Sequence, residues 1–92
     1  MIVAAGYISF QGLIAQNYNI TSCTWDAGNN YYDLVLAGIS YVSSSYVTLL
    51  STTSDTCTVH AGAISGHLIV RVRDNAGNLS QGAFSFMVLE VP

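Results

Sequence analysis

The chain has 92 residues, of which 51% are hydrophobic and only 8% charged, and its formal net charge at pH 7 is −3. This length predicts a single domain, residues 1–92, with one hydrophobic core. Lysine is absent and Arg71 and Arg73 are the only arginines, so no basic cluster could neutralise the phosphates of a nucleic acid or an anionic membrane. No apolar stretch approaches the ~20 residues of a spanning helix, and we expect no membrane insertion.

The expected elements are short strands separated by turns rich in Gly, Asn, Asp and Ser. Strands are predicted, in chain order, at residues 3–10, 18–25, 31–37, 46–52 and 57–64. Residues 13–15 either continue the first strand past a bulge or form a hairpin with it. Turns are expected at residues 26–30, 52–55 and 65–66, and residues 43–45 are expected to be a loop.

The last third of the chain, residues 67–91, is predicted to be a long antiparallel hairpin in the middle of a sheet. Apolar residues recur there at the sheet period of two. A turn containing Asp74, Asn75, Gly77 and Asn78 separates the two arms, and Asn and Gly tolerate the positive φ that hairpin turns need. The alternating apolar residues are Leu68, Val70 and Val72, then Phe84, Phe86 and Val88.

These patterns together predict an all-β protein. No apolar stripe with helical spacing persists for three turns, so we expect no helix. Seven or eight short strands spaced roughly ten residues apart are typical of an antiparallel β-sandwich, here of jelly-roll-like type. Seven charged side chains are few for a free monomer, since ordinary proteins have about 25% charged residues. This sparseness favours an oligomer that hides part of the surface.

No constellation of reactive residues is present, and we expect neither an enzyme nor a metal or cofactor. The serines lack the local context of a catalytic nucleophile. His60 and His67 belong to no spaced set of metal ligands, and Asp74 begins no complete calcium loop. Cys23 and Cys57 permit one disulfide, although two buried free thiols are favoured.

Aromatic and amide side chains near the expected turns are the best candidates for binding. Tyrosine and tryptophan combine an apolar ring with a polar tip, and amides add adaptable hydrogen bonds, which suits recognition of sugars or protein surfaces. The alternative is that some of them, Tyr32 and Trp25 first, are core residues. The predicted ligand-binding residues are Trp25, Asp26, Asn29, Asn30 and Tyr31, followed by Tyr41 and Tyr46.

Four segments carry a resemblance to a known group of proteins. They are GYISFQG (6–12), NYNITSCTWDAGNNYYDLVLAGISY (17–41), SSYVTLLS (44–51) and GHLIVRVRDNAGNLSQGAFSFMVLE (66–90). Together they resemble the terminal β domains of phage tail fibres and bacterial trimeric fibre adhesins. Cys23 and Cys57 depart from that pattern, which more often has Val or Thr there. The shared features are glycines and apolar alternation, with no catalytic or ligand motif among them.

The resemblance implies a homotrimer at the distal end of a longer fibre, outside the cell or on a cell or virion surface. Such a domain binds a cell-surface glycan or protein receptor without catalysing a reaction. The segment RVRDNAGNLS (71–80) also resembles Ig-like and fibronectin-like modules of bacterial surface proteins, which implies a monomeric spacer as the alternative. A trimeric ligand of the C1q or TNF type is a third possibility. Assigning function from fold-level likeness is an analogy.

Overall fold

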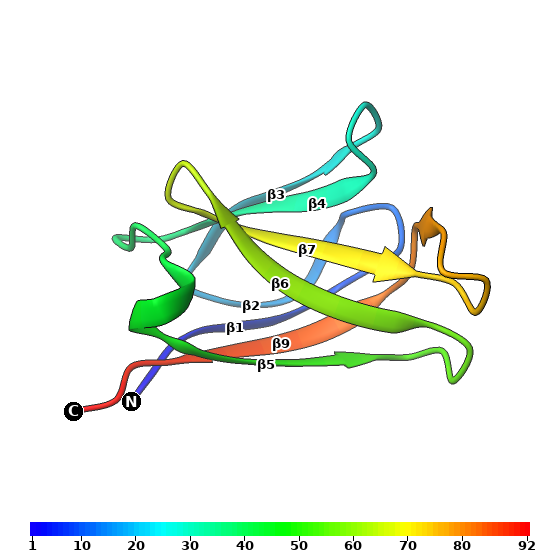
Figure 1. Ribbon diagram of the computed structural model, residues 1–92. Helices are drawn as coiled ribbons and strands as arrows, with labels where there is room; N and C mark the ends of the chain where they lie inside the picture. Colours follow the sequence, from blue (N-terminus) through cyan, green and yellow to red (C-terminus); the bar gives the residue numbers. More distant parts are fainter.

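Nine strands form two antiparallel sheets that pack face to face in the computed structural model, which describes residues 1–92 (Figure 1). The first sheet has the order β2 (Ile14–Tyr18), β1 (Ile2–Ile8), β9 (Phe84–Leu89), β5 (Val47–Thr52). The second has the order β3 (Ile20–Asp26), β4 (Tyr31–Leu36), β7 (His67–Arg73), β6 (Thr58–Ile64), with the short β8 (Leu79–Ser80) also pairing with β7. The predicted antiparallel sandwich is confirmed, with nine strands in place of seven or eight.

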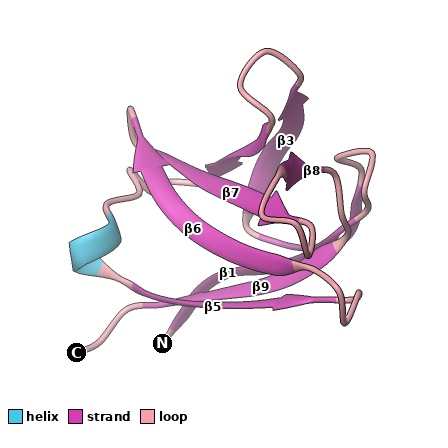
Figure 2. Ribbon diagram, turned by 45° about the vertical axis from the view of Figure 1, so that its right-hand side comes forward, coloured by secondary structure: helices cyan, strands magenta, loops and turns pink.

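The only helical element is η1 (Ser43–Ser45), a single 3₁₀ turn where a loop was expected (Figure 2). No helix has the length and apolar character needed to span a bilayer. Ile14 and Ala15 begin the second arm of a hairpin, since β1 pairs with β2 through partners such as Ala5 and Tyr18, and Leu13 lies in the turn before it. The chain leaves β2 at Asn19, whose φ of +60° breaks the predicted strand 18–25 and lets β3 join the other sheet.

One face of each sheet fills the core. Alternate residues of β4, β7 and β9 point inward, as the period-two pattern predicts. Tyr32, Leu34, Leu68, Val70, Val72, Phe84 and Val88 are all fully buried. At about 25 cal/mol per Å² of apolar surface, burial of these side chains is the main stabilising term of the fold.

The predicted hairpin over residues 67–91 is wrong, because β7 and β9 lie in different sheets. The turn itself forms: the Asp74 carboxylate accepts hydrogen bonds from the backbone N–H groups of Ala76 and Asn78. Only the two residues of β8 then pair with β7, and the chain crosses to the first sheet. Because β4 and β6 already flank β7, no full-length edge is left for β9.

Tyr32 connects the two sheets through its hydroxyl. The hydroxyl donates to the carbonyl of Phe10, 2.6 Å away, and accepts from the N–H of Gly82 at 2.9 Å. Its ring packs between Trp25 and Phe84, with ring centroids 4.7 and 5.2 Å away. Burial raises the pKa of this hydroxyl, so it remains protonated and able to donate. A residue of the second sheet therefore fixes the loop between β1 and β2 and the segment that leads into β9 of the first sheet.

We expect Tyr32→Phe to destabilise the fold by about 1–3 kcal/mol, because the Phe10 carbonyl and the Gly82 N–H lose their partner. In a domain of this size, each kcal/mol lowers the Tm by about 4–8 °C. Thermal and urea unfolding measure the change. Tyr18→Phe is the matched control, since the Tyr18 ring is 53% exposed and should lose less than about 0.5 kcal/mol. Equal stability of the two variants would contradict a structural role for the Tyr32 hydroxyl.

Candidate functional site

The outer faces of the two sheets differ in charge. The four strands of the first sheet contain no Asp, Glu, Lys or Arg. The second sheet contains four of the seven charged residues and both histidines: Asp26, Asp33, Arg71, Arg73, His60 and His67. The remaining charges, Asp55, Asp74 and Glu90, lie outside the strands. We refer to the outer side of the first sheet as the uncharged face and that of the second as the polar face.

The uncharged face presents apolar side chains to solvent. Strand register places Tyr18, Ala5, Met87 and Leu49 in one row across β2, β1, β9 and β5. A second row contains Ile2, Leu89 and Val47. Tyr18 and Leu49 are 53% and 54% exposed, and Ile2 and Val47 are also exposed. A contiguous apolar surface of this kind is typical of a protein–protein contact.

Two shallow hollows lie on this same face. One, of about 370 Å³, is lined by Tyr7, Gln16 and Tyr18 together with neighbouring backbone, and the other, of about 290 Å³, by Leu49, Leu50 and Met87. Both touch Ser85 on the central strand β9. Both are wide open to solvent, so they are shallow depressions of the surface and would not enclose a small molecule.

The turn 26–30 at the β3–β4 hairpin is held by Asp26. Its carboxylate accepts hydrogen bonds from the N–H groups of Gly28 and Asn29 at 3.0 and 3.1 Å, and from the Asn29 side-chain amide at 3.1 Å. The Asn29 side-chain bond, followed by its backbone N–H, lowers the pKa of Asp26. Asn30 has a φ of +57°, and its N–H donates to the Asp26 carbonyl at 2.7 Å. The turn is therefore a rigid loop with exposed amides.

The structure brings together four of the predicted site residues. Asp26, Asn29 and Asn30 form the turn, and Tyr31 begins β4 on the polar face, where the Cζ of Arg71 lies 5.1 Å from the centroid of its ring. Trp25 does not join them, because strand alternation turns it inward against Tyr32. Trp25 is thus half-buried core, as the alternative interpretation had it.

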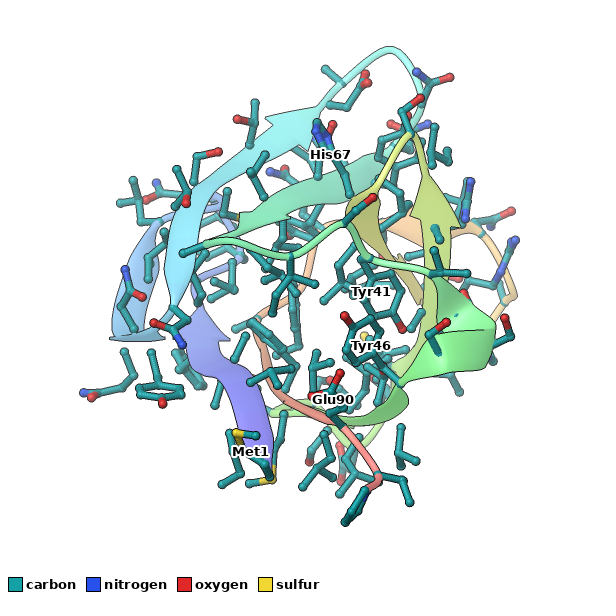
Figure 3. All side chains as sticks on the ribbon, turned by 90° about the vertical axis from the view of Figure 1, so that its left-hand side faces the viewer. Met1, Tyr41, Tyr46, His67 and Glu90 are labelled. Atoms are coloured by element: carbon teal, nitrogen blue, oxygen red, sulfur yellow. The ribbon has the colours of Figure 1, made fainter.

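Tyr41 and Tyr46 lie at the other end of the sandwich, beside η1 (Figures 1 and 3). Tyr41 is only 2% exposed, and its hydroxyl hydrogen-bonds the Thr48 hydroxyl at 2.5 Å. The two rings stack with centroids 5.8 Å apart. The expectation that Tyr41 offers a contact surface is therefore corrected: its ring fills the space between the sheets where the core would otherwise be open.

Four polar-face residues were missed as binding candidates. Arg71 contacts Tyr31, and His67 Nδ1 lies at hydrogen-bonding distance, 2.8 Å, from Asp33 Oδ1. His60 is the cross-strand partner of Arg71. The sequence places His67 and Arg71 opposite the apolar side of their strand, but which strands lie beside them depends on sheet order.

Cys23 offers no reactive thiolate. Both Cys23 and Cys57 are free thiols. Burial, followed by the charge of Asp33, raises the pKa of Cys23 to about 12, so this thiol stays protonated at neutral pH. No group of three or more His, Cys, Asp or Glu side chains is placed to hold a metal. The surface thus consists of an uncharged, apolar face and a polar face beside the turn 26–30.

Comparisons with known protein families, with characterised proteins and with solved structures find no match for this chain.

We expect an NMR titration of the Asp26 carboxylate to give a midpoint below the ordinary value of 3.8. A lowered pKa in the folded state means that the ionised carboxylate stabilises the turn above the unfolded pKa, and that this contribution is lost as pH falls through the folded pKa. Asn29→Ala should raise the midpoint towards 3.8, because it removes the largest cause of the shift. Asn30→Gly is the control, since it keeps the positive φ of position 30 and the Asn30 side chain makes no hydrogen bond with the carboxylate. An unchanged midpoint in Asn29→Ala would contradict this account of the turn.

Proposed function

We propose that this chain is a non-enzymatic binding domain at the tip of a homotrimeric fibre, and that it attaches a virion or bacterial surface to a cell-surface glycan or protein receptor. The observation that carries the proposal is the unequal distribution of charge between the two outer faces. One face has the composition of a contact between subunits, and the other has that of a solvated binding surface.

The uncharged face supports the assembly part of the proposal. Exposed Leu49, Val47, Ile2 and Tyr18 lie beside two hollows and no charged side chain lies among them. Covering this face with copies of the same chain would remove apolar area from water at about 25 cal/mol per Å². No charged group on it would lose its hydration, so the usual desolvation cost is small. The number three comes from the resemblance to trimeric fibre tips.

The turn 26–30 supports the ligand-binding part. It belongs to the second sheet, so it stays accessible when the first sheet is covered. Asp26 fixes its backbone in advance, which reduces the entropy lost when a ligand binds. Asn29, Asn30 and Tyr31 supply amide, hydroxyl and ring contacts of the kind that sugars and protein surfaces use.

The position of the two ends of the fold favours a tip over the alternative spacer. β1 and β9 are antiparallel neighbours, and Glu90 N–H donates to the Met1 carbonyl at 2.9 Å. The chain therefore enters and leaves the sandwich at the same end, while the turn 26–30 projects at the far end (Figure 1). Spacer modules in a string are usually joined at opposite ends. A monomeric Ig-like or fibronectin-like spacer is the second candidate.

Size-exclusion chromatography with light scattering should give a mass near three chains. Leu49→Lys should shift the mass to one chain, because a charge buried at a subunit contact without a partner costs several kcal/mol. Since Leu49 is 54% exposed in the single chain, this variant should keep its fold and its circular dichroism spectrum. Thr24→Lys adds the same charge to the polar face and should leave the mass unchanged. A wild-type mass of one chain would instead support the spacer.

Asn30→Gly, which removes the amide but keeps the positive φ of position 30, and Tyr31→Ala should each weaken binding to a glycan array or to whole cells by about tenfold, as expected for loss of a central contact of 1–2 kcal/mol. Both positions are on the surface, so the solution mass should not change. Thr24→Ala, at an exposed position of the same sheet outside the turn, is the control and should bind like the wild type. Wild-type binding by both the Asn30 and the Tyr31 variants would remove the turn from the proposed site.

A further inference from the structure

All basic side chains of this protein gather on the polar face. Arg71, Arg73, His60 and His67 occupy outward positions of the neighbouring strands β7 and β6, where the register pairs His60 with Arg71 and Ile64 with His67. The same face also carries Asp26 and Asp33, so its formal charge is zero, against −3 for the whole chain. We propose that Arg71, together with Tyr31 and His60, binds the carboxylate of an acidic sugar. The inference rests on the proposed glycan-binding function and names the ligand class.

The Arg71 guanidinium is held in a fixed position. Its Cζ lies 5.1 Å from the centroid of the Tyr31 ring, a cation–π contact. On the side of β6 it reaches over Gly62, where a side-chain Cβ would come within 3.3 Å of Nη1. The absence of a side chain at Gly62 therefore leaves the space that the guanidinium occupies. A long, flexible side chain is thus ordered before any ligand arrives, which lowers the entropic cost of binding.

The guanidinium also has no acidic partner, although acids lie on the same face. Asp33 is paired with His67, at 2.8 Å. Both carboxylate oxygens of Asp26 accept hydrogen bonds within the turn 26–30. Arg73 differs from Arg71 in donating to the Gly77 carbonyl at 3.0 Å. Arg71 is therefore the arginine whose donors are free and whose local carboxylates are engaged elsewhere.

The groups around Arg71 suit a sugar that carries a carboxylate. A planar guanidinium can bind both oxygens of a carboxylate at once, with charge-assisted hydrogen bonds. His60 is exposed beside it and makes no hydrogen bond within the chain, so its ring nitrogens are free for a hydroxyl. At the other side, the Tyr31 hydroxyl and the exposed Asn30 amide offer further partners. A carboxylate flanked by hydroxyls meets all of these groups, whereas a neutral sugar leaves the guanidinium unused.

The test is an NMR titration of the full chain with glucuronate, using glucose as the neutral counterpart and acetate as the carboxylate without a sugar. Glucuronate should give saturable shifts of the backbone amides of Tyr31, His60 and Arg71, with affinity at least about tenfold above glucose and acetate. Arg71→Gln should reduce that affinity by about tenfold or more, as expected for loss of hydrogen bonds to a charged group. Arg73→Gln, which removes the same charge two residues away, should reduce it less than about twofold. Gly62→Ala keeps the charge of Arg71 but moves the guanidinium, and should also weaken binding.

Three results would overturn the inference. Glucose or acetate binding as tightly as glucuronate would show that the site does not select an acidic sugar. Equal losses in the Arg71 and Arg73 variants would show that only net charge matters. The titration does not depend on assembly, so a trimer that fails to bind glucuronate would refute the acidic-sugar site and leave the fibre-tip proposal standing. A monomer that binds glucuronate would support the acidic-sugar site and refute the trimeric fibre tip.

Discussion

The Tyr32 hydroxyl is the contact on which the arrangement of the two sheets depends. It reaches from β4 of the second sheet to the loop after β1 and to the segment before β9, and so ties both central strands of the first sheet to the second. Its ring at the same time lies in the centre of the core, between Trp25 and Phe84. Tyr41 is the only other buried side chain with a hydroxyl, and its partner is Thr48. The hydrogen bonds of Tyr32 favour one packing of the sheets, because a shift would leave buried groups unpaired.

The inner faces of both sheets form the core, and the outer faces differ from each other in charge. The residues that alternate with the buried set are apolar or neutral on the first sheet, while the second sheet has Asp33, His67 and Arg71. In the proposed trimer, other copies of the chain would cover this uncharged four-stranded surface. The same division leaves the second sheet exposed in an assembly. The two halves of the proposed function therefore use opposite sides of one thin sandwich.

The proposed binding surface is rigid for reasons that are visible in its contacts. Asp26 closes the turn with three hydrogen bonds, and Asn30 takes the left-handed conformation that the return of the chain requires. Tyr31 follows directly, and its ring makes a cation–π contact with the Arg71 guanidinium. Each of these groups is fixed by neighbours rather than by a ligand, which is the condition under which weak polar contacts add up to specific binding.

The sequence by itself determined the all-β class, most strand positions, the turn 26–30 and the buried sides of β4, β7 and β9, because these follow from the two-residue period of a strand and from local turn chemistry. Strand partners were decided only by the tertiary structure. The alternation of apolar residues in β7 and β9 fits either one hairpin or two facing sheets. The structure has two sheets, so the expected hairpin was wrong. Tyr41 was likewise expected on the surface from its place near a loop, but it packs in the core. Arg71 enters the proposed site only because the order of the strands places Tyr31 and His60 beside it. The two-residue spacing determines on which side of a strand a side chain lies. The packing of the sheets determines which residues that side contacts.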